Sequence, residues 1–187
     1  MPTQAATLHR LLTTTTTLIA LTIIILYSAS ILPVSTISVL TIASAIVPVC
    51  IIRSDVNTAV MVYLASSIIS VFFIPLNIWL LYTLIFGGYG IVKYFIERLR
   101  KEKVEILLKF IYYNVIFILA VILAKAILGI DVLLAAEKII SKYIAVGGRL
   151  LSGVLYWGIG AVVYYLYDYA MTLIITFYME RIHNKIK

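Results

Sequence analysis

The sequence predicts an all-α, polytopic membrane protein, a bundle of six transmembrane helices with a short amphipathic helix between the fifth and the sixth. The composition is 64% hydrophobic and 12% charged, whereas soluble domains are about half apolar and about a quarter charged. The apolar residues form runs of roughly 20, which is the length that a helix needs to cross a bilayer. Because little chain lies outside these runs, we expect a single transmembrane domain over residues 1–187.

The first predicted span covers residues 11–32 and is closed by Pro33. His9 and Arg10 precede it, and the small residues at 28–30 are also typical of a signal-peptide cleavage site. The apolar run is long enough to cross, and the chain remains apolar after it. These two features favour a retained first helix over a cleaved signal peptide.

Five further spans follow, each ended by a charged residue, a proline or a glycine. They are predicted over residues 36–52, 56–74, 78–96, 104–128 and 150–179. The fourth contains Gly87, Gly88 and Gly90, and no strand precedes these glycines. A kink or close packing of helices is therefore favoured over a phosphate-binding loop.

The connection between the fifth and sixth spans, residues 129–149, is the only long one. Its apolar residues recur at helical spacing, and Asp131, Glu137 and Lys138 supply a polar side. We expect a short amphipathic helix over residues 131–146, lying on the membrane or capping the bundle.

Basic residues assign the connections to the two sides of the membrane, because cytoplasmic segments are enriched in Lys and Arg. Six spans put both termini on one side, together with the second–third and fourth–fifth connections. That side holds nine basic residues against three on the other: Arg10, Arg53, Arg98, Arg100, Lys101, Lys103, Arg181, Lys185 and Lys187 against Lys138, Lys142 and Arg149. We therefore expect a multi-pass protein of the cell membrane with both termini in the cytoplasm and residues 97–105 as a cytoplasmic turn.

Ionisable residues within a span are costly unless they have a partner or water. Asp168 lies deep in the sixth span, and Lys93 lies near the inner end of the fourth. We predict that Lys93 and Asp168 form a structural ion pair. Lys109 is the alternative partner, and either lysine can instead extend its ammonium to the interface. Coupling to a proton or an ion is a further alternative for Asp168.

Aromatic and polar residues of the last two spans are candidates for ligand contact. Trp157 and Tyr164 share a helical stripe with Asp168. A membrane-surface belt explains rings at segment ends, but Tyr164 is expected inside the bilayer. Asn114 lies near the middle of the fifth span, where an amide bonds a neighbouring helix or a ligand. Lys125, near the outer end, either extends to the interface or meets an anionic ligand.

The sequence contains no pattern for catalysis or metal binding. It has no HExxH motif, no Ser/His/Asp set and no paired carboxylates, and Cys50 is its single cysteine. We therefore expect neither an enzyme nor a bound metal or cofactor. The positive-inside pattern accounts for the net charge of +7, so no nucleic-acid partner is expected.

The chain resembles the substrate-binding S components of energy-coupling factor (ECF) vitamin transporters. The likeness covers its length, its six segments, the short uncharged outer turns "PVS" and "PLN", and the long outer connection before the last helix. The stretch "FGGYGIVKYFIERLRKEKVEILLKFIYYN", residues 86–114, also looks like small, uncharacterised bacterial six-helix membrane proteins.

The resemblance implies a binding subunit that captures a small vitamin-like or heterocyclic solute in an outward pocket built by helices four to six. Carried over to this chain, the pocket residues are Asn77, Trp79, Tyr82, Asn114, Lys125, Arg149, Trp157 and Tyr164. Aromatic rings would stack on a flat heterocycle, an amide would bond its edge and a cation would meet an acidic group. The helix at 131–146 would act as a lid.

The resemblance also implies partners, namely a transmembrane coupling subunit and two cytoplasmic ATPases. In that family the first helix often carries an Ala-x-x-x-Ala face for the coupling subunit. The nearest match here is Thr16-x-x-x-Ala20, with Thr13 and Thr17 beside it. The chain has no Walker A sequence, so any use of ATP would come from partners.

Two other functions fit the same pattern. One is a non-transport scaffold or assembly protein of the bacterial envelope, like the small shape-determining proteins that share a similar helix bundle. Tight packing of helices four to six would favour that function, whereas a cavity lined by aromatic and polar groups would favour transport. The other is an autonomous carrier or channel, but the two halves of the sequence show no inverted repeat.

Overall fold

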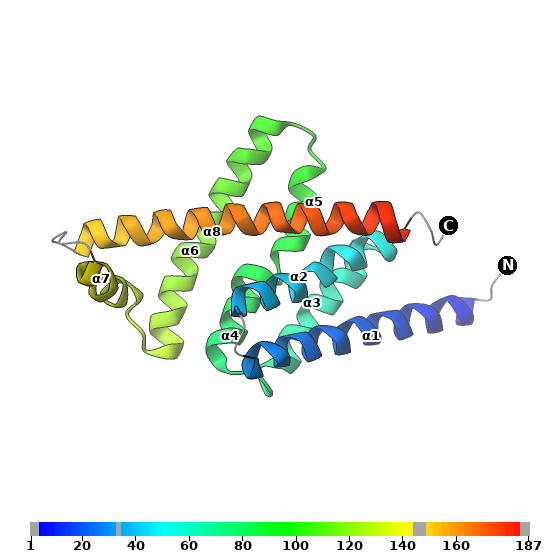
Figure 1. Cartoon of the computed structure of the whole chain (residues 1–187). Helices are drawn as coiled ribbons and strands as arrows, with labels where there is room; N and C mark the ends of the chain where they lie inside the picture. Colours follow the sequence, from blue (N-terminus) through cyan, green and yellow to red (C-terminus); the bar gives the residue numbers. More distant parts are fainter. Residues whose placement is uncertain (1–3, 33–34, 144–148, 184–187) are drawn as a thin grey trace. The chain divides into compact units, whose positions relative to one another are not determined.

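The computed structural model describes residues 4–32, 35–143 and 149–183 (Figure 1). Every regular element in these ranges is a helix. Among the described residues, five helices are long and apolar enough to cross a membrane: Leu12–Ile31, Thr36–Arg53, Leu76–Glu97, Glu102–Leu128 and Leu151–Arg181. The helix Val56–Ser70 is apolar but shorter.

The chain forms two compact units. The first contains Met1–Leu99 with Met171–Lys187, and the second contains Arg100–Ala170. The single transmembrane domain over residues 1–187 therefore stays a prediction.

In the first unit, α1 (Gln4–Ile31), α2 (Thr36–Arg53) and α3 (Val56–Ser70) lie side by side (Figure 1). Small and β-branched side chains that are fully buried pack together at their contact: Val47, Cys50, Ala59 and Val62. Such side chains let helix backbones approach closely, which is how apolar helices gain packing energy in a lipid environment.

Helix α3 begins at a side-chain cap and ends earlier than the predicted span of 56–74. The carboxylate of Asp55 accepts a hydrogen bond from the backbone N of Thr58 at 3.4 Å. At the other end, the backbone N of Phe72 donates to Ile69 O at 3.2 Å, a bond to the third residue back. The last turn therefore tightens before Pro75, which disfavours helix at the residue preceding it.

The predicted fourth span is three consecutive helical segments, α4 (Leu76–Leu81), the π-helical η1 (Tyr82–Phe86) and α5 (Tyr89–Glu97). The backbone N of Gly87 donates to Tyr82 O at 2.6 Å, so the turn is one residue wider than in an α-helix. The hydroxyl of Tyr63, from α3, donates to Thr83 O at 2.7 Å. A neighbouring helix thus satisfies a carbonyl that the wide turn releases.

The glycines of this segment permit close packing, as the sequence analysis favoured. A Cβ at Gly87 would lie 2.8 Å from Tyr63 Cε2, and a Cβ at Gly90 would lie 2.8 Å from Pro48 Cδ. A side chain at either position would therefore push α3 or α2 away.

The second unit contains α6 (Glu102–Leu128), α7 (Val132–Tyr143) and the first part of α8 (Arg149–Tyr178), which the π-helical η2 (Met179–His183) follows. Helix α6 ends at Gly129, whose φ of 67° lies in the left-handed region that glycine adopts without strain. Helix α7 occupies the connection in which a helix over 131–146 is predicted, and residues 144–148 lie outside the described ranges.

Helices α6 and α8 run antiparallel within the second unit. Lys109 contacts Asp168, whereas Phe117, about two turns further along α6, contacts Tyr156. Residue numbers therefore increase along α6 in the direction in which they decrease along α8.

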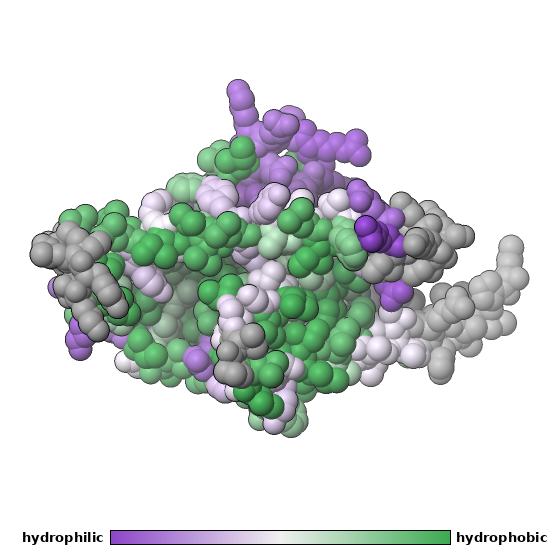
Figure 2. All heavy atoms as spheres, in the orientation of Figure 1, coloured by the Kyte–Doolittle hydropathy of each residue, from purple (hydrophilic) through white to green (hydrophobic). Residues whose placement is uncertain are grey.

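The surface separates polar from apolar residues. Figure 2 shows hydrophilic residues gathered over the turn that joins α5 and α6, and hydrophobic residues over the flanks of the helices. Exposed apolar side chains follow the length of α6: Ile111, Val115, Ile118 and Ile122. Such a continuous apolar surface is typical of a protein that lies in lipid or against another helix.

Candidate functional site

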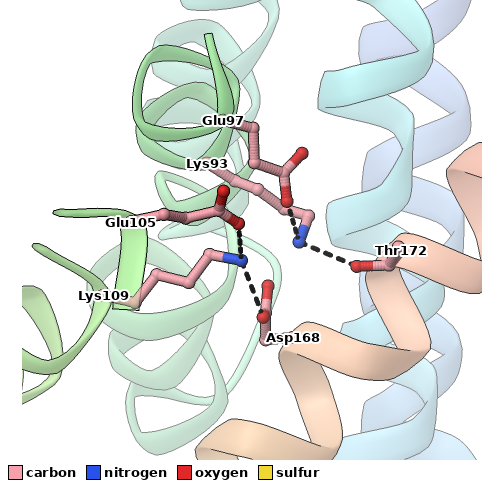
Figure 3. A network of polar contacts seen from close by, with 6 residues as sticks. All are labelled: Lys93, Glu97, Glu105, Lys109, Asp168 and Thr172. Carbon is pink, nitrogen blue, oxygen red and sulfur yellow. Dashed lines mark hydrogen bonds and ion pairs between the residues drawn. The ribbon is translucent and has the colours of Figure 1, made fainter. Parts of the chain in front are cut away.

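A buried lysine in α5 organises the first of two charged clusters (Figure 3). Lys93 is 1% exposed, and its Nζ lies 2.6 Å from Glu97 Oε1 one turn along the same helix. The same Nζ donates to Thr172 Oγ1 of α8 at 2.9 Å. A buried ammonium is costly unless it is paired and hydrogen-bonded, and Glu97 supplies the ion pair while Thr172 supplies the hydrogen bond.

A second buried lysine organises the other cluster, in the second unit (Figure 3). Lys109 Nζ lies 2.9 Å from Glu105 Oε1 of the same helix and 3.0 Å from Asp168 Oδ2 of α8. The side chains of Lys109 and Asp168 are 9% and 15% exposed. The pair ties α6 to α8 at the end of α6 that follows the charged turn.

Asp168 therefore has Lys109 as a partner, the alternative that the sequence left open. The sequence prediction named Lys93 for this pairing. Lys93 and Asp168 belong to different units, so their ion pair stays a prediction.

An aromatic and amide cluster joins α6 to α8 and includes three predicted pocket residues. Trp157 Nε1 donates to Asn114 Oδ1 at 3.1 Å, and Asn114 Nδ2 donates to Phe110 O at 2.8 Å. The ring of Tyr164 lies 5.3 Å from that of Tyr113, centroid to centroid. Asn114 and Trp157 are half-buried, whereas Tyr164 is buried. The structure thus brings Asn114, Trp157 and Tyr164 together around one tyrosine.

That tyrosine, Tyr113, was not selected from the sequence. Its hydroxyl donates to Trp157 O at 2.5 Å, and its ring lies 6.0 Å from the indole. Gly160 makes the contact possible, because a Cβ there would lie 2.7 Å from the Tyr113 hydroxyl oxygen. A signal was available, since Tyr113 follows Lys109 by one helical turn and so shares the face of α6 that carries the buried lysine.

Of the two predicted cationic contacts, Lys125 lies away from this cluster. Lys125 lies eleven residues beyond Asn114 in α6, about 16 Å along the axis. Its side chain is 70% exposed and its Nζ lies 3.4 Å from Asp131 Oδ2. Asp131 also accepts from the backbone N of Leu134 at 3.2 Å, so Lys125 meets the residue that caps α7. Arg149 begins α8, and its side chain lies outside the described residues.

The remaining predicted pocket residues belong to the first unit, where two of them form hydrogen bonds with residues of α3. Trp79 Nε1 donates to Ser67 O at 2.8 Å. The hydroxyl of Tyr82, fully buried, lies 3.2 Å from Ser66 Oγ. Asn77 is exposed at the start of α4. Trp79 and Tyr82 thus serve as contacts between helices.

A small hollow lies elsewhere in the first unit. Its volume is about 190 Å³, and its walls come from α2, α5 and α8: Pro48, Ile51, Ile52, Gly90, Lys93, Tyr94, Glu97 and Ile175. No predicted pocket residue whose side chain the structure describes lines this hollow.

The predicted partner-contact residues share one exposed face of α1. Thr13, Thr16, Thr17 and Ala20 are all exposed. Thr16 Oγ1 donates to Leu12 O at 2.9 Å, and Thr17 Oγ1 donates to Thr13 O at 2.8 Å. Because these two hydroxyls bond their own helix, the face presents small and mainly apolar groups to its surroundings.

Within the described ranges, no three His, Cys, Asp or Glu side chains come close enough to hold a metal ion. Comparisons of the chain with protein-family models, with curated proteins and with solved structures found no match.

Proposed function

We propose that this protein is a solute-binding membrane subunit that captures a small, flat, vitamin-like or heterocyclic molecule from the outer side of the cell membrane. By its resemblance to ECF S components, it would deliver the solute with a transmembrane coupling subunit and cytoplasmic ATPases. The contact between Trp157 and Asn114 carries the proposal, because it places an aromatic face and an amide edge together on two facing helices.

The chemistry of that cluster suits a flat heterocycle. The indole of Trp157 and the rings of Tyr113 and Tyr164 offer faces for stacking. The Asn114 carbonyl oxygen can accept a hydrogen bond from a ring N–H, and its amide NH2 can donate to a ring nitrogen or an exocyclic oxygen. Half-exposed polar groups in the middle of an apolar helix are unfavourable against lipid, so a polar solute or a partner covering them would be stabilising.

The topology that we propose has six spans, with Val56–Ser70 as the shortest. The proline, glycine and charged residues at the ends of the predicted spans and the charged turn at 97–105 support this topology, together with the excess of basic residues on one side. In it, both termini face the cytoplasm, α7 lies at the outer surface as an amphipathic lid, and the small face of α1 meets the coupling subunit.

The chain has two tryptophans, Trp79 and Trp157. Replacing Trp79 therefore leaves Trp157 as the single tryptophan whose fluorescence can report ligand binding. In purified Trp79→Phe protein, we expect a compound from a panel of vitamins and their precursors to change the emission of Trp157 and to raise the melting temperature. Adding Asn114→Ala is expected to weaken that binding about tenfold, because it removes one hydrogen-bond partner and leaves another unsatisfied.

Asn57→Ala is the matched control, since Asn57 is an exposed asparagine of α3 that has no part in the cluster. It should leave the affinity unchanged. If no compound alters either the emission of Trp157 or the melting temperature, the solute-binding proposal is wrong.

The orientation has a separate test, based on the buried single cysteine Cys50. In a Cys50→Ala background, Lys101→Cys should react with a membrane-impermeant maleimide only after the cells are opened. Asn77→Cys should react in intact cells, because Asn77 is exposed in the proposed outer turn. Labelling of Lys101→Cys in intact cells would show that the proposed orientation is inverted.

A second candidate function is a scaffold or assembly protein of the envelope. The bonds of Trp79 to Ser67 and of Tyr82 to Ser66 favour it, because they assign two predicted pocket residues to helix packing. Co-purification from native membranes separates the candidates. Recovery of an ATPase pair supports uptake, whereas recovery of cell-wall enzymes supports a scaffold.

A further inference from the structure

We propose that the hollow between α2, α5 and the end of α8 seats part of one acyl chain of an anionic phospholipid, whose phosphate is held by Arg53 and Arg98. This site belongs to the first unit and uses none of the residues of the proposed solute site. It would be a lipid site on the cytoplasmic leaflet.

The hollow is bounded at one end by the contact of Gly90 with Pro48, where a Cβ would lie 2.8 Å from the proline ring. The other α2 and α5 wall residues all follow this contact in sequence, so both helices run from it in the same direction. Helix α2 then ends at Arg53, and α5 ends one residue before Arg98. Both arginines are exposed, and each directly follows a wall residue of the hollow, Arg53 after Ile52 and Arg98 after Glu97.

The walls suit a hydrocarbon chain. Pro48, Ile51, Ile52 and Ile175 supply apolar surface. The ammonium of Lys93, which also lines the hollow, has Glu97 and Thr172 as partners, so the ion pair is internal to the wall. An acyl chain can lie against such a compensated pair without leaving a single charge buried.

The volume of the hollow indicates which kind of ligand fits it. At about 190 Å³ it is smaller than the roughly 300–1,000 Å³ pockets that enclose drug-sized ligands. A whole heterocyclic solute would not be enclosed, whereas several methylene groups of one chain would be.

The two arginines select the headgroup. A guanidinium binds a phosphate with two parallel hydrogen bonds, and clusters of basic residues on the cytoplasmic side of membrane helices recognise anionic lipids. A zwitterionic lipid with the same chains offers the same hydrocarbon but no net charge, so it is the natural comparison.

The test is native mass spectrometry of the full chain, purified in mild detergent and supplied with equal amounts of phosphatidylglycerol and phosphatidylcholine that carry the same acyl chains. We expect one phosphatidylglycerol to be retained about tenfold more than phosphatidylcholine. Arg53→Gln with Arg98→Gln should abolish that preference. Arg100→Gln with Lys101→Gln removes the same charge from the neighbouring turn and should preserve it.

A second pair of variants tests the seat of the chain. Ile52→Trp fills the hollow from α2, and Ile175→Trp fills it from α8, so each should lower the retention of both lipids about tenfold in protein that still elutes as a single folded species. Having both variants keeps the test valid if one fails to fold. Equal retention of the two lipids by wild type, equal losses in the two charge variants, or full retention in a folded Trp variant would each overturn the proposal.

Discussion

Lys109→Met should destabilise the protein by about 3–5 kcal/mol, the effect of breaking a buried ion pair by removing one partner. Lys109 Nζ contacts Glu105 at 2.9 Å and Asp168 at 3.0 Å, so its loss leaves two carboxylates facing a methionine. Asp168, whose side chain is 15% exposed, cannot readily turn to solvent. The measurement is the melting temperature in detergent, together with the yield of monodisperse protein.

Lys125→Met is the matched control, because it removes the same ammonium from an exposed pair. The side chain of Lys125 is 70% exposed and lies 3.4 Å from Asp131. Such pairs contribute less than about 1 kcal/mol, so the melting temperature should hardly change.

A double variant shows how much of the cost comes from the carboxylate of Asp168, since Glu105 is unchanged in it. Lys109→Met with Asp168→Leu replaces the pair by apolar side chains and should recover much of the stability lost in Lys109→Met. If the single variant melts like wild type, or if the double variant is no more stable than the single one, then the ion pair does not stabilise the contact of α6 with α8.

Gly90→Ala should destabilise the protein by about 1–3 kcal/mol, although alanine is the better helix former. The new Cβ would lie 2.8 Å from Pro48 Cδ. The proline ring is bonded to the backbone of α2 at both ends and cannot rotate away, so the two helices must separate. The melting temperature measures the effect.

Gly158→Ala is the control for this prediction, since no atom lies within 4 Å of a Cβ at that position of α8. It should raise stability by about 0.5–1 kcal/mol, because the unfolded chain loses freedom without any new clash. Pro48→Ala combined with Gly90→Ala should be more stable than Gly90→Ala alone. Equal melting temperatures for Gly90→Ala and Gly158→Ala would contradict the close approach of α2 and α5.

The candidate site was only partly predictable. Asn114, Trp157 and Tyr164 were selected because polar and aromatic groups inside a span need a reason, and the structure places them together. Residue type does not distinguish Tyr113, on which Trp157 and Tyr164 converge, from the adjacent Tyr112, and the available signal is its place one helical turn after Lys109. The structure shows that the Tyr113 hydroxyl reaches the neighbouring helix, where it donates to Trp157 O beside Gly160.

The helical class and the positions of the long apolar helices follow from the sequence by itself. Apolar run length and the placement of Pro, Gly and charged residues are local properties of the sequence. They determine where a helix can begin and end without reference to its packing partners. The end of α6 at Gly129 and the start of α2 at Thr36 are examples.

Only the tertiary structure decides how each helix is rotated about its axis and which side chains meet. The π-helical turn at Tyr82–Phe86 exists beside a tyrosine of α3, and the bond of Lys109 to Asp168 joins residues far apart in the chain. Both depend on the packing of side chains from separate helices. Hydropathy and residue spacing depend only on residues that are near one another in the sequence. They therefore do not show which side chains of separate helices pack together.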